Sequence, residues 1–282
     1  MKPGSLDYAR PATLEEALAL LEEHGDDAKV LAGGQSLVPL LNMRLARPAV
    51  VIDINRVARI DNVAHDGGAA RVGPLVRQSA FSGVNALADR CLPYVGHYVT
   101  RNRGTVGGSI AHADARAELP VALVALAGSV VAASTSGRRT IPAEEFFVSH
   151  FTTSLQPNEL VVETIWPDLG AGWGHAFAEL ALRAGDYALG MTAVVLRVEN
   201  GCVAEARIVV GATADRPLLL EHSLIGTAIT ATNAQEVGAA AEASVHPRDG
   251  LHASGRYQRS LTGLLVERAL LEAWHAATDA EA

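Results

Sequence analysis

Two glycine-rich turns, far apart in the sequence, constrain what this chain can fold into. The first reads Ala-Gly-Gly-Gln-Ser-Leu over residues 32–37, and the second reads Arg-Asn-Arg-Gly-Thr-Val-Gly-Gly-Ser over residues 101–109. Adjacent glycines lack Cβ atoms, so the backbone can turn sharply and bring its N–H groups close to a ligand. A run of such amides forms a concavity that suits an anionic oxygen. Two such turns with nearby hydroxyl side chains predict one long phosphate-bearing ligand, held from both sides.

The first turn lies between a predicted strand and a predicted helix. Thr13 opens a capping box, and leucines at helical spacing predict a helix that ends at His24-Gly25. Strands are expected over residues 29–32 and 50–53, with a helix over residues 37–45 between them. Free N–H groups and the helix dipole both favour an anion at such a strand-to-helix turn.

The remaining elements predict an α+β chain in three units, residues 1–57, 58–172 and 173–282. The second unit is expected to hold strands over 70–73, 129–133, 138–141 and 160–165, and helices over 77–90, 93–99 and 121–127. The third is expected to hold strands over 174–182, 191–198 and 203–210, and helices over 217–225, 234–243 and 260–276. Asn200-Gly201 is a strong hairpin signal between the last two strands.

Composition excludes several classes of protein. The 282 residues carry a net charge of −8 without a basic stripe, which argues against a nucleic-acid partner. No signal peptide and no membrane-spanning apolar run are visible, so we expect a cytoplasmic protein without a transmembrane segment. The two cysteines, Cys91 and Cys202, cannot ligate an iron–sulfur cluster or a four-cysteine zinc site.

Common catalytic and nucleotide motifs are missing. The chain has no phosphate-loop signature, no Gly-x-Gly-x-x-Gly opening a βαβ unit and no Gly-x-Ser-x-Gly elbow. Its ten histidines are scattered without metal-ligand spacing. We therefore expect neither a catalytic residue nor a metal site in this chain.

Two further segments each allow two interpretations. Asp114 and Glu118 follow the second glycine turn, where they could accept hydrogen bonds from ribityl or ribose hydroxyls, or could cap and stabilise the next helix. Tyr187 lies in an Arg-x-Gly-Asp-Tyr-Ala segment, where its ring could stack on a planar cofactor or pack at a sheet edge. From spacing alone, the structural interpretation is favoured for all three residues.

Taken together, these segments resemble the medium, FAD-binding subunit of the molybdenum hydroxylases, the family of carbon monoxide dehydrogenase and xanthine dehydrogenase. The resemblance covers essentially the whole chain. It rests on Leu-x-Tyr-x-x-Pro at residues 6–11, both glycine turns, Asp114 with Glu118-Leu119-Pro120, the segment over 183–188 and Tyr-Gln-Arg-Ser-Leu at residues 257–261.

The resemblance implies a two-subdomain FAD-binding domain of the vanillyl-alcohol oxidase (PCMH) type. A small C-terminal α+β domain follows, with a three-stranded antiparallel sheet and helices. The FAD diphosphate is expected between two sets of residues, Ala32, Gly33, Gly34, Gln35, Ser36 and Leu37 on one side and Thr105, Val106, Gly107, Gly108 and Ser109 on the other. Glu118 and Asp114 would then bind the polyhydroxyl parts of FAD, and Tyr187 would shield one face of the isoalloxazine.

The implied function is that of an oxidoreductase subunit that transfers electrons. A partner small subunit would hold two [2Fe–2S] clusters and a large subunit the molybdenum cofactor, in a dimer of heterotrimers, with FAD bound non-covalently in this chain. One alternative is a stand-alone flavin oxidase of the same fold, with His112 as a candidate for a covalent flavin link. Another is a cofactor-free scaffold protein in which the glycine turns merely connect elements.

Overall fold

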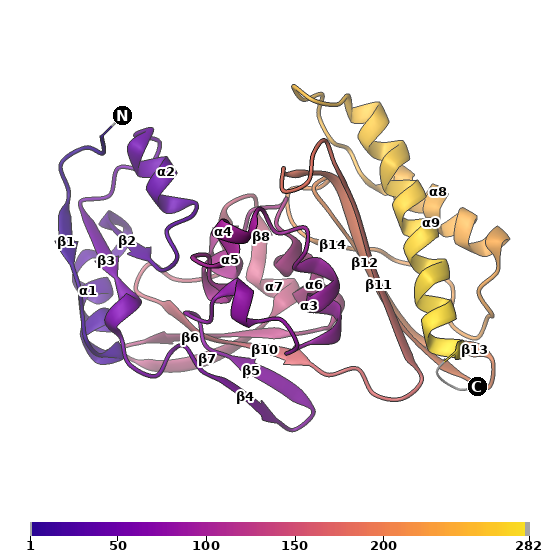
Figure 1. The fold of residues 1–282 in the computed structure, drawn as a ribbon, viewed down its shortest axis with the longest axis horizontal. Coiled ribbons are helices and arrows are strands. Elements are labelled where there is room, and N and C mark those ends of the chain that lie inside the picture. The colour runs from indigo at the N-terminus through magenta and orange to yellow at the C-terminus, as the bar shows by residue number, and fades with distance from the viewer. Residues whose placement is uncertain (1, 280–282) are drawn as a thin grey trace.

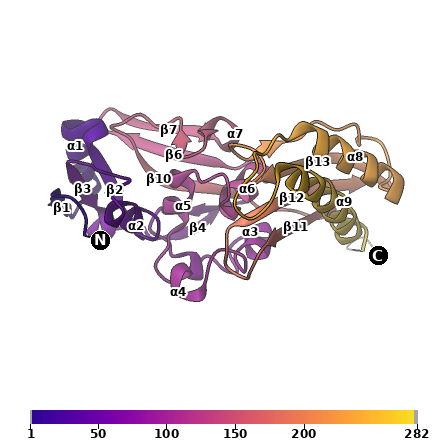
Figure 2. The ribbon, with the colours of Figure 1, turned by 90° about the horizontal axis from the view of Figure 1, so that it is seen from above.

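The computed structural model describes residues 2–279, which form three parts arranged in a row (Figure 1). Residue 1 and residues 280–282, which belong to the expected first and third units, lie outside the described residues. Seen from above, the molecule is elongated, with the N-terminal part at one end and the C-terminal part at the other (Figure 2). The order of the parts in space follows the order of the sequence.

The N-terminal part is a parallel sheet of strand order β1-β3-β2. Its elements are β1 (Asp7–Ala9), α1 (Leu14–His24), β2 (Ala28–Leu31), α2 (Leu37–Asn42) and β3 (Val50–Asp53). The predicted start of α1 is confirmed, because the Thr13 hydroxyl accepts a hydrogen bond from the Glu16 N–H at 3.2 Å. Gly25 ends the helix with a φ of 49°.

The central part is an antiparallel sheet of strand order β4-β5-β10-β6-β7, with helices on one face (Figure 1). Its strands are β4 (Val63–Asp66), β5 (Ala69–Val72), β6 (Ser129–Ser134), β7 (Gly137–Pro142) and β10 (Leu160–Pro167). Its helices are α3 (Ala86–Cys91), α4 (Tyr98–Arg101), α5 (Val106–His112), α6 (Glu118–Ala125) and α7 (Ala143–Phe146). The short strands β8 (Phe147–Ser149) and β9 (Thr152–Thr153) pair with each other. The predicted hairpin of β6 and β7 is confirmed.

The continuous helix expected over residues 77–90 is wrong. That segment holds a 3₁₀ turn at Gln78–Ala80 and then α3, separated by Gly83 at a φ of 81°. Asn85 begins α3, because its side chain accepts hydrogen bonds from the next helical N–H groups. The helix expected over residues 93–99 is also wrong, since Gly96 turns the chain with a φ of 47° and α4 begins only at Tyr98.

The C-terminal sheet has four strands rather than the expected three, in the order β11-β12-β13-β14. Its strands are β11 (Trp173–Ala181), β12 (Ala188–Glu199), β13 (Cys202–Gly211) and β14 (Leu218–Leu219). The helix expected over residues 217–225 is therefore wrong, because Leu218 and Leu219 pair with Val210 and Val209. A short leucine run does not distinguish a buried helix from an edge strand, and Pro217 is tolerated beside an edge.

Two helices, α8 (Ala231–Ser244) and α9 (Gly255–Asp279), complete the C-terminal part. The predicted Asn200-Gly201 turn is confirmed, with φ values of 52° and 73° that join β12 to β13. The two helices approach closely, since a Cβ atom on Gly238 would lie 2.6 Å from the Gly263 carbonyl oxygen. Within residues 2–279, no helix combines the length and apolar character needed to cross a bilayer.

Helix α6 joins the central part to the C-terminal part. All eight of its residues are buried, Glu118 included, because it lies between the helices of the central part and β12 and β13. The sheet packs tightly on it, since a Cβ atom on Gly211 would lie 2.5 Å from a methyl group of Val121. The core cluster around α6 therefore includes side chains of both parts, such as Phe177 and Met191.

This junction buries two carboxyl groups, those of Glu118 and Glu179. Glu179 is half-buried on β11, and its Oε2 has no hydrogen-bond partner in the described part of the chain. Burial, followed by the Glu118 carboxyl, raises the pKa of Glu179 to about 8. Burial is also the largest cause that raises the pKa of Glu118 to about 7. Both groups are thus partly protonated near neutral pH.

We predict that Glu179→Gln stabilises the protein relative to the wild type and that this gain grows as pH rises. The folded protein binds the Glu179 proton more tightly than the unfolded chain, whose carboxyl has a pKa near 4.5. The contribution of Glu179 to stability therefore falls as pH rises from about 4.5 through about 8, and the amide removes this loss. The gain in the free energy of unfolding should be on the order of 1 kcal/mol larger at pH 8 than at pH 5. Urea denaturation at both pH values measures it.

The matched control is Glu145→Gln, which changes an exposed carboxyl on α7. This variant should follow the wild-type dependence on pH. If the free energy of unfolding of Glu179→Gln depended on pH as that of the wild type does, the protonation inferred for Glu118 and Glu179 would be contradicted.

Candidate cofactor-binding site

The two glycine-rich turns meet in space. We call residues 32–37 loop 1 and residues 103–109 loop 2; loop 1 follows β2, and loop 2 runs from the end of α4 into α5. A Cβ atom on Gly33 would lie 2.8 Å from the Gly104 Cα and would collide with the Arg103 carbonyl oxygen. A Cβ atom on Gly108 would lie 3.6 Å from the Ala32 Cβ. The backbones of the loops are therefore in direct contact, and only glycine fits at position 33.

Loop 1 carries N–H groups that the fold does not use. In the described part of the chain, the N–H groups of residues 33–36 donate no hydrogen bond. Gly33 is buried, and Gly34 adopts a φ of 72°. Buried N–H groups are nearly always paired in proteins, so these donors suit an anionic oxygen of a ligand.

Loop 2 uses several of its groups to hold its own shape. The Thr105 hydroxyl accepts a hydrogen bond from the Gly108 N–H at 3.0 Å. Gly107 lies against Pro74, because a Cβ atom on it would lie 2.5 Å from the Pro74 Cα. Ser109 is half-buried, and its hydroxyl makes no hydrogen bond within residues 2–279. Of the two hydroxyls in this loop, that of Ser109 is therefore the one left free for a ligand.

The other predicted residues of the loops differ in exposure. Val106 is fully buried in the central core, so its side chain packs α5 and does not face a ligand. Ser36 and Leu37 are half-buried, and Gln35 is exposed, with its side-chain amide donating to the Gly33 carbonyl at 3.1 Å.

A cavity of about 680 Å³ opens beside loop 1. Loop 1 contributes Ala32, Gly33, Gly34 and Gln35 to its lining. The other lining residues are Arg10, Leu31, Val38, Pro39, Asp53, Asn55, Arg77, Asn102 and Arg103. The cavity thus touches both loops, and its volume is typical of a small-molecule site.

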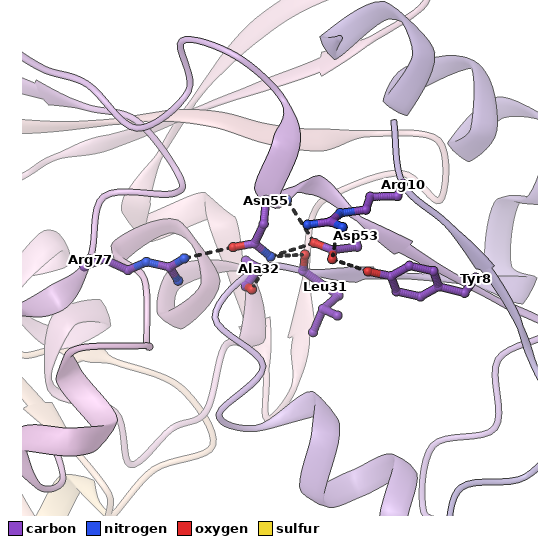
Figure 3. A network of polar contacts seen from close by, with 7 residues as sticks. All are labelled: Tyr8, Arg10, Leu31, Ala32, Asp53, Asn55 and Arg77. Carbon is purple, nitrogen blue, oxygen red and sulfur yellow. Dashed lines mark hydrogen bonds and ion pairs between the residues drawn. The ribbon is translucent and has the colours of Figure 1, made fainter. Parts of the chain in front are cut away.

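Sequence reasoning missed a polar network on the wall of this cavity. Figure 3 shows Tyr8, Arg10, Asp53, Asn55 and Arg77 converging beside loop 1 from separate segments. A signal was present, because Asp53 and Asn55 come at the carboxyl end of the buried strand β3. Ligands commonly bind outside the carboxyl ends of parallel strands.

Of the predicted site residues, only Ala32, Gly33, Gly34 and Gln35 line the cavity; Ser36, Leu37 and residues 105–109 do not. Asp114, Glu118 and Tyr187 do not line it either, but they lie close to one another. The buried Asp114 carboxylate accepts from the Arg116 N–H at 2.9 Å, so it stabilises a turn and does not cap α6. Glu118 is 7% exposed in the first turn of α6, and Tyr187 is 65% exposed between β11 and β12. Partial burial, followed by Asp114 and Glu118, raises the pKa of the Tyr187 hydroxyl.

The donors and acceptors of this region fit FAD. Loop 1 offers unused N–H groups to a diphosphate, and Arg77 and Arg103 bring positive charge to the same cavity. Asp114 and Glu118 offer carboxyl oxygens to hydroxyl groups. The loop backbones already touch at Gly33, so a ligand would lie beside this contact, against the unused N–H groups of loop 1.

Known protein families match both sections of the chain. The FAD-binding domain found in molybdopterin dehydrogenases matches residues 4–169, and the C-terminal domain of carbon monoxide dehydrogenase flavoproteins matches residues 175–273. The 6-hydroxypseudooxynicotine dehydrogenase complex subunit alpha of Paenarthrobacter nicotinovorans is 43% identical, over 98% of this chain and 97% of its own.

A second relative is the carbon monoxide dehydrogenase medium chain of Hydrogenophaga pseudoflava, 34% identical over 97% of this chain and 99% of its own. The solved carbon monoxide dehydrogenase of that organism, in a form lacking the Mo-pyranopterin moiety, superposes with a TM-score of 0.95 at 34% identity. The superposition covers 98% of this chain and 99% of the solved chain. Sequence and structure therefore agree that this chain belongs to the family of FAD-binding medium subunits of carbon monoxide dehydrogenase and related molybdenum hydroxylases.

Proposed function

We propose that the chain is the electron-transfer subunit of a molybdenum hydroxylase. The FAD that it binds, non-covalently, would supply the redox chemistry that carries electrons from the [2Fe–2S] clusters of a partner subunit to an external acceptor. Oxidation of the substrate would belong to the partner subunit that holds the molybdenum cofactor. The chain's own work is to bind FAD and to keep it in one orientation.

One observation carries this proposal: loops 1 and 2 touch, beside a cavity, with N–H groups left unused. Gly33 lies against the Arg103 carbonyl group, and residues 33–36 donate no hydrogen bond in the described part of the chain. This is the arrangement that a diphosphate requires, because its oxygens need several donors within a short distance.

The proposed contacts are the ones expected from the sequence. Ala32, Gly33, Gly34, Gln35, Ser36 and Leu37 bind the diphosphate from one side, and Thr105, Val106, Gly107, Gly108 and Ser109 form the other side. Within this second set, Thr105 and Val106 act by shaping the loop, since one caps α5 and the other is buried. Glu118 and Asp114 accept hydrogen bonds from ligand hydroxyls, and the exposed ring of Tyr187 covers one face of the isoalloxazine.

The proposed assembly contains two other kinds of subunit. Residues 1–57 and 58–172 form the FAD-binding domain, and residues 173–282 form the C-terminal domain of a medium subunit. A small iron–sulfur subunit and a large molybdenum subunit complete a heterotrimer, which pairs into a dimer of heterotrimers. We place this complex in the cytoplasm, where thiols such as the free Cys91 and Cys202 stay reduced.

We predict that Gly33→Ala prevents FAD retention. The added Cβ atom would collide with the Arg103 carbonyl oxygen and would force loop 1 away from loop 2. Overpacking of this kind costs about 1–3 kcal/mol of free energy, which is enough to lower the FAD content about tenfold or more. The flavin-to-protein ratio of the purified variant, taken from its absorption spectrum, measures the effect.

Gly170→Ala is the matched control, because a Cβ atom there meets no atom within 4 Å. It should retain FAD as the wild type does. Full flavin occupancy in Gly33→Ala would contradict the proposed site between the loops.

We predict that the chain, purified with its co-expressed partners, has an absorption spectrum with both flavin and iron–sulfur bands. Acid precipitation should release the yellow cofactor, because the link is non-covalent. Flavin that stays with the pellet would instead support the stand-alone oxidase, with His112 as a candidate for the link. A colourless complex that takes up no added FAD would support the scaffold alternative.

A further inference from the structure

A series of hydrogen bonds on the cavity wall joins loop 1 to loop 2 through two side chains (Figure 3). The Asn55 Nδ2 donates to the Ala32 carbonyl oxygen at 2.8 Å, and its Oδ1 accepts from the Arg77 Nη2 at 2.9 Å. The Arg77 Nη1 donates to the Arg103 carbonyl oxygen at 2.5 Å. Asn55 and Arg77 thus hold one backbone carbonyl in each segment, next to Gly33 and Gly104.

Asp53 fixes the orientation of Asn55. Its carboxylate is buried and accepts from the Asn55 N–H at 2.9 Å, from the Asn55 Nδ2 at 2.6 Å and from the Tyr8 hydroxyl. Burial by itself would raise the pKa of Asp53, but the hydrogen bonds from Tyr8 and Asn55 outweigh it and hold the pKa below its ordinary value. Asp53 therefore stays ionised and keeps the Asn55 amide in one position.

The bond to Ala32 also orients an N–H group of loop 1. In a planar trans peptide, the C=O and N–H groups point in opposite directions. The peptide that joins Ala32 to Gly33 is held by its carbonyl at Asn55, so the Gly33 N–H points away from Asn55. This N–H donates no hydrogen bond within residues 2–279, which leaves it available to a ligand.

Arg77 and Arg103 bring positive charge to the cavity without a direct ion pair in the described part of the chain, although the more distant carboxylates of Asp53 and Asp61 act on Arg77. Both line the cavity, and neither has a carboxylate within ion-pair distance in the described part of the chain. Partial burial, followed by the like charge of Arg103, lowers the pKa of the Arg77 guanidinium. Asp53 is the one carboxylate of the lining, and it lies 3.8 Å from Arg10. Two guanidinium groups without a direct ion pair in one cavity favour an anion there.

We propose that Asn55 and Arg77 are positioning residues that lock loop 1 and loop 2 together around the diphosphate of FAD, and that Arg77 and Arg103 supply the positive charge that faces it. This inference rests on the proposed function, because it takes FAD as the ligand. The two positioning residues differ in what they supply. Asn55 acts through geometry alone, whereas Arg77 acts through geometry and charge.

The test measures the dissociation constant of FAD for the full chain after its flavin has been removed. Flavin fluorescence reports binding, and the titration is made at low and at high salt. Arg77→Gln removes a charge and a bridge, so its dissociation constant should rise about tenfold or more. The dissociation constant of Arg77→Gln should also depend less on salt than that of the wild type, because salt screens charge attraction and this variant has one charge fewer to screen. Asn55→Ala should weaken binding to a similar extent but keep the wild-type dependence on salt.

Arg77→Lys and Asn55→Asp keep the test decisive where the first variants fold poorly. Lysine preserves the charge but cannot bridge Asn55 and the Arg103 carbonyl as a planar guanidinium does, so binding should weaken while the dependence on salt persists. Aspartate removes the donor to Ala32 and also places a second carboxylate against Asp53 in the cavity, so binding should weaken more than in Asn55→Ala. Arg139→Gln is the matched control, since Arg139 also bonds a carbonyl group, that of Ser154, at 2.8 Å on another face.

Dissociation constants within twofold of the wild type for all four variants would overturn the inference while leaving the proposed function intact. If Arg77→Gln and Asn55→Ala changed the salt dependence of FAD binding to the same extent, the assignment of a charge effect to Arg77 alone would be overturned. Failure of the wild-type chain itself to bind FAD would instead overturn the proposed function.

Discussion

Gly33 and the Arg103 carbonyl group lie in contact, and this contact fixes how loop 1 meets loop 2, while an apolar core packs the N-terminal part on the central sheet. No side chain fits at position 33, so the backbones of two loops that are distant in sequence come together directly. The polar network of Asp53, Asn55 and Arg77 lies along the same seam and ties each loop to the other. Because the seam is built from backbone and short side chains, N–H groups remain free at its surface and a ligand can reach them.

The junction between the central and C-terminal parts follows a different physical rule. There the contact is apolar, and α6 is buried on all sides between two layers of structure. The exceptions include Arg207, which donates to the Val124 and Ala125 carbonyl oxygens, and the carboxyl groups of Glu118 and Glu179. Burial raises the pKa of both carboxyl groups, so the junction disfavours their ionised forms. The molecule thus adds a polar, donor-rich seam to the apolar packing at one end of the central part and has a largely apolar junction at the other. Glu118 lies at this junction, close to Asp114 and Tyr187.

Much of the fold could be predicted because local chemistry and tertiary structure agree. The Thr13 cap, the Asn200-Gly201 turn and the long apolar strands each specify one conformation, and the structure contains them. The errors fall where local patterns are ambiguous. Residues 77–90 look helical until Gly83 and Asn85 are counted as breaks, and the leucines after Pro217 pair with β13 instead of coiling.

The site was predictable only in part. Glycine loops have a sequence signature, because close backbone approach demands a missing Cβ atom. Asn55 has only its place just after β3 as a signal, and Arg77 has none, because each is a single polar residue with partners in other segments. Their importance depends on distances that only the folded chain defines. The same holds for Glu179, which reads as an ordinary strand residue until its neighbours are known.

The central claim is that loops 1 and 2 bind the FAD diphosphate between them, and an experimental structure of the complex with FAD tests it most directly. The account predicts diphosphate oxygens within hydrogen-bond distance, about 2.7–3.2 Å, of N–H groups in residues 33–36. It also predicts that the Asn55 and Arg77 bonds to the Ala32 and Arg103 carbonyls persist in that structure. A diphosphate bound elsewhere, with no ligand at loops 1 and 2, would contradict this claim.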